Sequence, residues 1–171
     1  MNKIKLFALM VFVLGISSLS RAQDQPPPPI QNSAFDMAVG NWSAVPYEMM
    51  GTKITSEESS IYLKHGQYLF VEIVGKSSDG NTYTGTVIIT ADANGNIKGH
   101  SYDIWGGDWM LTYTGKAEGN VISLHGANDY MSEDRVITIN GDKMSHDVNF
   151  SIKMPTGDVN EKLTVEYNKV K

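Results

Sequence analysis

Apolar and polar positions alternate with a period of two along most of the chain, and residues 142–154 show the pattern most clearly. One set of side chains comprises Met144, His146, Val148, Phe150, Ile152 and Met154, and polar residues occupy the positions between them. Successive side chains of a strand point to opposite faces, so this alternation predicts a half-buried β-strand. One histidine, His146, falls on the face that should be apolar.

Similar segments recur over the rest of the chain, separated by short turns. The predicted strands are 42–49, 59–65, 68–76, 83–91, 97–105, 109–116, 121–126, 135–140, 144–153 and 163–170. Asp-Gly and Asn-Gly pairs in the connections supply the positive φ angles of tight hairpins. About ten strands joined in this way predict an all-β fold, an antiparallel up-and-down meander that closes into a barrel and so removes its edges.

The residues before the first strand, 33–40, predict one short N-terminal helix. Ser33 can serve as its N-cap and Gly40 can end it. Phe35, Met37 and Val39 could plug an apolar interior.

The first 22 residues have the parts of a secretory signal peptide. Lys3 and Lys5 precede an apolar run, and Ser20 and Ala22 place small residues at positions −3 and −1 of a cleavage site. The run is short for a membrane-spanning helix and polar, Pro-rich sequence follows it, so no membrane insertion is expected after cleavage. We therefore expect a secreted or periplasmic protein, with a signal peptide at 1–22, a Pro-rich linker at 23–32 and a β-barrel domain at 33–171.

Charge and cysteine content exclude several function classes. Cleavage removes Lys3, Lys5 and Arg21 and none of the 19 acidic residues, which leaves a net charge of about −8. Nucleic-acid binding is not expected, because phosphate contacts require Lys and Arg. The absence of cysteine excludes disulfides, thiol catalysis and Cys-ligated zinc.

A short helix that runs into VGNW, residues 39–42, resembles the Gly-x-Trp opening of lipocalins and their calycin relatives. The resemblance implies that Trp42 packs across the closed end of the barrel. It also implies that a basic side chain of the last strand covers the indole, and Lys169 fits that position.

The middle of the chain, residues 85–126, is similar to the lipocalin-like, DUF1579-type family of small secreted proteins. Gly99, Tyr102 and Asp103 match a Gly-x-x-Tyr-Asp-like element of that family, and Gly-containing hairpins follow. The resemblance implies a calycin-like barrel of about ten strands. It implies no activity, because most members have none assigned, and fold alone does not supply one.

The inward-facing His146 has two interpretations. It could be an axial ligand or a general base inside the barrel. The preferred interpretation is a core histidine bonded to a carbonyl or a tyrosine hydroxyl, because one inward histidine lacks a partner set. The heme-binding nitrobindins resemble this fold but carry their heme histidine on the final strand, which here reads KLTVEYNKV. Tyr167 or His146 could substitute, but heme is not expected and no cofactor is predicted.

The acidic residues leave a second question open. Glu72 lies between Phe70 and Val74 on one face of a predicted strand, and whether that face is inward cannot be decided from the pattern. If it is inward, Glu72 needs a polar partner such as Tyr83, Arg135 or His146. The other candidates, which are expected to be solvated turn residues, are Asp103, Asp108, Asp129, Glu133 and Asp134. No His-x-His or His-Glu-x-x-His spacing exists, so no metal site is predicted.

Three functions are compatible with these features. The preferred hypothesis is a secreted module that binds a small apolar or amphipathic molecule inside the barrel. Its predicted walls are Trp105, Trp109, Tyr113, Met144 and Phe150, and its predicted polar anchors are His146, Glu72 and Tyr102. A barrel-type isomerase or hydrolase, with His146 as base oriented by Glu72 or Asp103, is the alternative. The third possibility is a structural or interaction barrel with a filled interior and no ligand.

Overall fold

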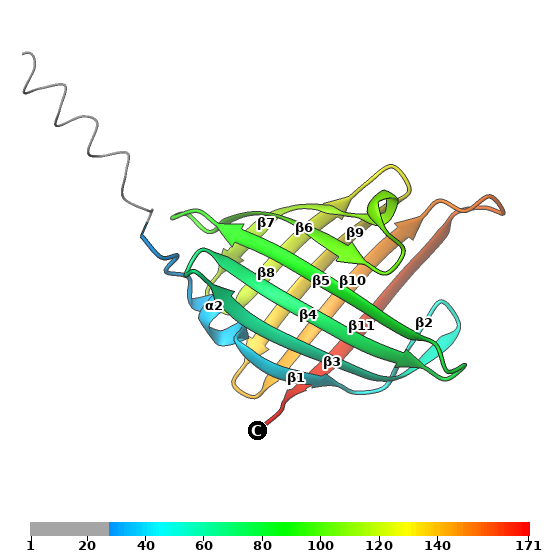
Figure 1. Ribbon diagram of the computed structural model, residues 1–171, viewed down its shortest axis with the longest axis horizontal. Coiled ribbons are helices and arrows are strands. Elements are labelled where there is room, and N and C mark those ends of the chain that lie inside the picture. Colours follow the sequence, from blue (N-terminus) through cyan, green and yellow to red (C-terminus); the bar gives the residue numbers. More distant parts are fainter. Residues whose placement is uncertain (1–27) are drawn as a thin grey trace, which may run out of the picture.

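The computed structural model describes residues 28–171, in which one short helix precedes a closed sheet (Figure 1). The predicted signal peptide and the first five residues of the predicted linker lie outside the described residues. The helix is α2 (Ser33–Ala38), and a 3-10 turn, η2, spans Gly107–Trp109. The strands are β1 (Gly40–Ala44), β2 (Tyr47–Met49), β3 (Thr52–Lys64), β4 (Tyr68–Ser77), β5 (Thr82–Ala91), β6 (Asn96–Asp103), β7 (Thr112–Glu118), β8 (Val121–Ala127), β9 (Met131–Asn140), β10 (Lys143–Ile152) and β11 (Val159–Lys169).

Every strand from β3 to β11 pairs antiparallel with the next one along the chain. β1 pairs with β11 on one side and with β3 on the other, and this closes a ring of ten strands. β2 pairs with β3 alone and extends the wall beside β1. The predicted all-β, antiparallel, up-and-down barrel with a short N-terminal helix is therefore confirmed. No helix among the described residues is long and apolar enough to cross a membrane.

The first predicted strand, 42–49, is broken into β1 and β2 at Val45 and Pro46. A proline has no N–H to donate to a neighbouring strand, so regular pairing stops there. Val45 still donates to the carbonyl of Glu166 at 2.7 Å, which holds the break against β11.

Two further boundaries differ from the prediction. β3 begins at Thr52 rather than at residue 59, and its register shifts between Ile54 and Ser56. This irregularity obscures the alternation of the first half of the strand. β7 begins at Thr112 rather than at residue 109, because η2 occupies the preceding residues.

Helix α2 is capped by Asn32, so the prediction that Ser33 is the cap is wrong. Asn32 Oδ1 accepts from the backbone N–H groups of Ala34 at 3.0 Å and Phe35 at 3.2 Å. Ser33 instead donates its hydroxyl to the carbonyl of Gly119 at 2.8 Å. The side chain at the cap position is the one that can reach these orphan donors.

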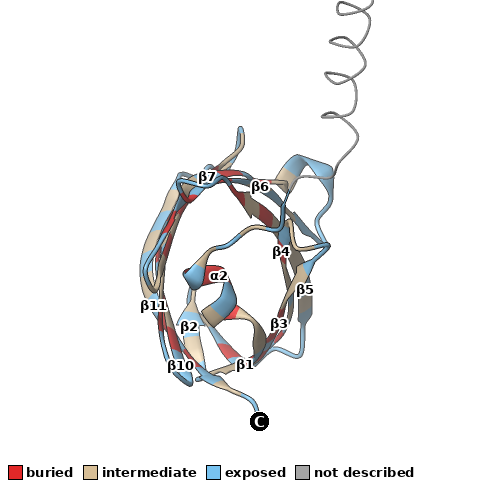
Figure 2. Cartoon of the chain, turned by 90° about the vertical axis from the view of Figure 1, so that its left-hand side faces the viewer, coloured by how far each residue is buried: buried red, intermediate tan, exposed pale blue. Residues whose placement is uncertain are grey.

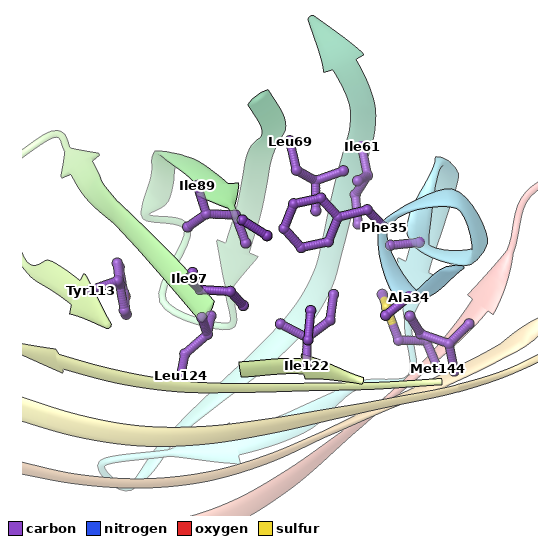
Figure 3. Packing of buried hydrophobic residues seen from close by; sticks show 14 of the residues in the cluster. Ala34, Phe35, Ile61, Leu69, Ile89, Ile97, Tyr113, Ile122, Leu124 and Met144 are labelled. Carbon is purple, nitrogen blue, oxygen red and sulfur yellow. The ribbon is translucent and has the colours of Figure 1, made fainter. Parts of the chain in front are cut away.

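The helix fills one end of the barrel, here called the closed end (Figure 2). Phe35 is 1% exposed and points into the barrel toward Leu69, Ile89 and Ile97 (Figure 3). Burying a phenylalanine side chain contributes about 1.5–3 kcal/mol, so this plug stabilises the barrel and orients the chain that enters β1.

Trp42, at the start of the ring, is fully buried beneath this helix. Its Nε1 donates to the carbonyl of Ala38 at 2.8 Å. Lys169 is its register partner on β11, and Lys169 Nζ lies 5.0 Å from the centre of the indole ring. The structure thus places side by side the two residues that the resemblance pairs.

Candidate functional site: the barrel interior

Past the helix plug, the barrel interior becomes polar. Eight of the inward-facing polar side chains are here called the interior cluster: Tyr47, Glu57, Tyr83, Tyr113, Glu133, Arg135, His146 and Tyr167. Glu57, Glu133 and His146 are each less than 8% exposed. Charged residues are almost never so buried unless they are paired, so their partners decide what the interior can do.

Glu133 and Arg135 form an ion pair inside the barrel. Arg135 Nη2 lies 3.1 Å from Glu133 Oε2, and Arg135 Nε donates to Oε1 at 3.2 Å. Tyr113 also donates to Oε1, at 2.7 Å. Burial alone would raise the pKa of Glu133 and lower that of Arg135, but their mutual attraction outweighs it and shifts both in the opposite direction. Both groups are therefore charged at neutral pH.

His146 lies against this pair. Arg135 Nη1 is 3.1 Å from His146 Nδ1, and a guanidinium can only donate, so Nδ1 accepts and Nε2 carries the proton. That Nε2 is buried and has no hydrogen-bond partner among the described residues. Burial and the neighbouring Arg135 lower the pKa of His146 well below its usual range. The ring is therefore neutral, and within residues 28–171 its Nε2–H has no acceptor.

Glu57 is surrounded by tyrosine hydroxyls from three strands. Tyr47 donates to Oε2 at 2.7 Å, Tyr83 donates to the same oxygen, and Tyr167 donates to Oε1. Burial and the charge of Glu57 raise the pKa of each of these tyrosines, so all three remain protonated donors. Among the described residues, no Lys, Arg or His side chain forms an ion pair with Glu57.

Two glycines set the orientation of tyrosines in the cluster. Gly75 is the register partner of Tyr83, and Gly126 is the partner of Tyr113. A Cβ built at either glycine would overlap the ring of the opposite tyrosine. Each ring therefore lies flat over a bare stretch of backbone, which directs its hydroxyl toward a carboxylate in the barrel.

Of the predicted wall residues, three are buried inside. Tyr113 is part of the interior cluster, and Met144 packs against helix α2 in the main core (Figure 3). Phe150 belongs to a second, smaller apolar group with Val148 and Ile152, and Trp109 packs against it.

Trp105 and Tyr102 lie outside the interior. Trp105 is 66% exposed in the β6–β7 connection, and Tyr102 is 43% exposed near the end of β6. Trp109 connects Trp105 to the barrel, since its ring centre lies 5.7 Å from that of Trp105 and 6.0 Å from that of Tyr130. These aromatic residues form a rim at the end opposite the helix, here called the far end.

Glu72 is exposed on the outer wall, so the interpretation that places it inside the barrel is wrong. The inward face of β4 carries Leu69, Val71 and Ile73. Glu72 and Glu58 line an open depression of about 560 Å³ on the outside of β1, β3, β4 and β5.

The two carboxylates expected to orient a catalytic His146, Glu72 and Asp103, therefore do not contact the histidine. Asp103, the other candidate, is exposed and accepts from the backbone N–H of Trp105 at 2.8 Å. His125 pairs with Asp134 on the outer surface at 2.8 Å. Among residues 28–171, no group of three or more metal-ligating side chains is close enough to hold a metal ion.

Sequence reasoning missed most of the interior cluster. Glu57 lies before the predicted start of its strand, and Glu133 was expected in a solvated loop. One signal was available: extending the alternation backward from Ile61 by steps of two reaches Glu57, and from Ile139 it reaches Arg135 and Glu133.

Comparison with known proteins identifies structures of similar fold but assigns the chain to no family. No protein-family model and no curated protein matches the sequence. Among solved structures, Rv2717c from M. tuberculosis matches with a TM-score of 0.60 and 15% identity, over 81% of this chain and 96% of that one. The S-type phycobiliprotein lyase CPES from Guillardia theta matches with a TM-score of 0.57 and 13% identity, over 80% and 91%. These neighbours share the fold of this chain, a closed antiparallel β-barrel.

Proposed function

We propose that this protein binds a small amphipathic molecule inside its barrel. The observation that carries the proposal is the interior cluster, which contains a buried His146 N–H that has no partner in the described part of the chain. A buried donor left unsatisfied costs about 1–3 kcal/mol, and an apolar filling of similar shape is often as stable as a buried ion pair. Stability alone therefore does not account for the buried polar groups of the interior cluster, whereas ligand binding does.

The distribution of side chains matches an amphipathic ligand. The interior cluster offers polar contacts in the middle of the barrel, and Phe150, Ile152 and Trp109 offer apolar contacts toward the far end. Small-molecule sites commonly combine apolar walls with a few placed polar groups. The ligand head would contact the cluster and its apolar body would extend toward the aromatic rim.

Catalysis with His146 as a base is less well supported. The lone pair on Nδ1 accepts from Arg135, and the proton sits on Nε2, so no free basic nitrogen faces the interior. The low pKa of His146 further weakens it as a proton acceptor at neutral pH.

We also propose that the protein acts outside the cytoplasm, after removal of residues 1–22, and that it is related to the DUF1579-type secreted proteins. Support for the relationship comes from Gly99, Tyr102 and Asp103. A Cβ at Gly99 would overlap the backbone of Ile88 and Ile89 on β5, so the glycine of this element is required by close strand packing.

The proposed function is tested by native mass spectrometry of the mature protein purified from its own compartment. A bound small-molecule mass is expected, and its loss is expected in His146→Leu but not in the surface control His125→Leu. A ligand-free mass, together with no binding of dansyl fluorophores that carry a cationic, a neutral or an anionic end group, would mean that the barrel is filled and would overturn the proposal.

A further inference from the structure

Glu57 is a buried carboxylate without an ionic partner among the described residues. It is 5% exposed, and its hydrogen-bond donors are the neutral hydroxyls of Tyr47, Tyr83 and Tyr167. Three donors leave room for a fourth, because a carboxylate has about four lone-pair directions. Neutral donors solvate a buried charge but do not neutralise it.

The other charges of the interior are already compensated. Arg135 directs Nε and Nη2 to Glu133 and Nη1 to His146, so each of its nitrogens is used. His146 is neutral because its pKa is low. Glu57 is therefore the one carboxylate of the interior cluster that lacks an ionic partner among the described residues.

The groups around Glu57 suit a cation. Three tyrosine rings converge on the carboxylate, and the faces of aromatic rings attract organic cations. Tyr47 and Tyr83 are partly exposed, so this side of the group is the accessible one. An ammonium entering here could pair with Glu57 and contact the rings together.

The far end of the barrel is acidic as well. Its connections carry four acidic residues, Asp79, Asp108, Asp129 and Asp158, and one basic residue, Lys153. The Nζ of Lys153 donates to the carbonyl of Asp129 at 2.9 Å. A mouth lined by one sign of charge raises the local concentration of ligands of the opposite sign. The aromatic rim at the same end offers further cation–π contacts.

We propose that the ligand of the barrel is an organic cation, an amine or a quaternary ammonium with an apolar body, and that its charged head pairs with Glu57. This inference rests on the proposed function, since it names the chemical class of the molecule that the interior holds. The apolar body of the ligand would lie against Phe150 and Trp109, toward the far end.

Three dansyl probes that share one fluorophore and differ in the end group test the inference. They are dansylcadaverine, which ends in an ammonium, N-hexyl dansylamide, which is neutral, and N-dansyl-6-aminohexanoate, which ends in a carboxylate. Binding is followed by the blue shift and enhancement of dansyl emission. We expect dansylcadaverine to bind at least about tenfold more tightly than the neutral probe, the size expected for one charge-assisted hydrogen bond.

The matched variants are Glu57→Gln and Glu72→Gln, since Glu72 has the same charge but lies on the outer wall. Glu57→Gln should remove the preference for dansylcadaverine and leave the affinity of the neutral probe unchanged, which also shows that the barrel is intact. Glu72→Gln should change neither affinity. If Glu57→Gln does not fold, Glu57→Met provides a neutral side chain of similar length for the same comparison.

The possible outcomes separate the inference from the proposed function. Equal or tighter binding of the neutral or anionic probe would leave the proposed function standing and overturn the cation inference. A preference for dansylcadaverine that survives in the Glu57 variants would overturn it too, because attraction to the acidic far end would then explain the preference. If none of the three probes binds, the proposed function fails and the inference fails with it.

Discussion

Arg135 donates from Nη1 to Nδ1 of His146 over 3.1 Å, and this contact fixes both the tautomer and the charge of the histidine. The neighbouring positive charge and the buried surroundings both oppose protonation. Tyr167 packs on the same ring at 4.6 Å between ring centres and supplies no counter-charge, because its hydroxyl is donated to Glu57. His146 is thus held neutral in the folded state and is free to protonate in the unfolded chain.

The first prediction follows from this difference. The folded-state pKa of His146 is lowered, so as the pH falls below about 6.5 the unfolded chain takes up a proton that the native state does not. The free energy of unfolding should therefore decrease with decreasing pH, with a slope from this group of up to about 1.4 kcal/mol per pH unit. The lowered pKa of Glu133 adds a further loss, but only in more acidic solution, below about 4.5.

Urea unfolding at steps between pH 7.5 and pH 5 measures this slope. His146→Gln should flatten it, whereas His125→Gln, which changes an exposed histidine on the outer face, should keep it. Equal slopes in the wild type and in His146→Gln would show that the Arg135–His146 contact does not control the protonation of the ring.

The barrel itself could be predicted because each wall strand repeats a simple rule. β10 shows it best, since buried residues such as Met144, His146 and Val148 alternate with exposed or half-buried polar residues over the whole strand. The Asp-Gly and Asn-Gly pairs predicted the hairpins between strands. The expected contact of Trp42 with Lys169 predicted that the first and last strands are neighbours. The alternation and the turn residues can be recognised within short segments of the sequence. The contact of Trp42 with Lys169 requires only that the first and last strands are neighbours.

Most of the interior cluster was missed, because its charged residues look like surface residues in the sequence. The alternation in β3 can be followed backward from Ile61 only as far as Glu57, because the register shifts between Ile54 and Ser56. Glu133 is adjacent to Asp134, and only the alternation continued backward from Ile139 distinguishes the inward residue from the outward one. The contacts of Glu57 come from strands far apart in the chain, and only closure of the barrel brings them together.

The second prediction concerns the Glu133–Arg135 pair. Removing one partner leaves a buried charge uncompensated, so Arg135→Met should lower the free energy of unfolding by about 3–5 kcal/mol. Tyr113→Phe removes one hydrogen bond to the same carboxylate and should cost about 1.5–3 kcal/mol. Both are measured by urea denaturation at pH 7.

A double variant separates two contributions to this loss of stability: the lost attraction between Glu133 and Arg135, and the cost of leaving the Glu133 carboxylate buried without a partner. Adding Glu133→Gln to Arg135→Met removes the uncompensated carboxylate, so the double variant should be more stable than Arg135→Met alone. Asp134→Asn, which affects an exposed pair with His125, should cost no more than about 1 kcal/mol. If the double variant is the least stable of the set, the Glu133 carboxylate does not destabilise the protein when Arg135 is removed.

The third prediction tests the packing of Tyr83 on Gly75. A methyl group at this position would overlap the ring, so Gly75→Ala should displace Tyr83 and lower the free energy of unfolding by about 1–3 kcal/mol. Gly107→Ala is the control, since a Cβ there meets no atom within 4 Å, and it should change stability by no more than about 0.5 kcal/mol. Similar unfolding midpoints for the two variants would mean that the ring does not depend on the bare backbone.

The fourth prediction concerns the closed end. Lys169 Nζ lies 5.0 Å from the centre of the Trp42 ring, and its stem passes over Gly40, where a Cβ would meet Lys169 Cε at 2.6 Å. Lys169→Met keeps most of the apolar stem and removes the charge, so it isolates the cation–π contribution. We expect a loss of about 0.5–1 kcal/mol in the free energy of unfolding.

The control for this variant is Lys171→Met, because the side chain of Lys171 is 89% exposed and its ion pair with Asp142 is at the surface. Gly40→Ala should be more damaging than Lys169→Met, since Gly40 has a φ of +143° and an added Cβ would also displace the lysine stem. If Lys169→Met and Lys171→Met unfold at the same urea concentration, the cation over Trp42 adds nothing to the hydrophobic closure, and the stability of this end comes from the indole and helix α2 alone.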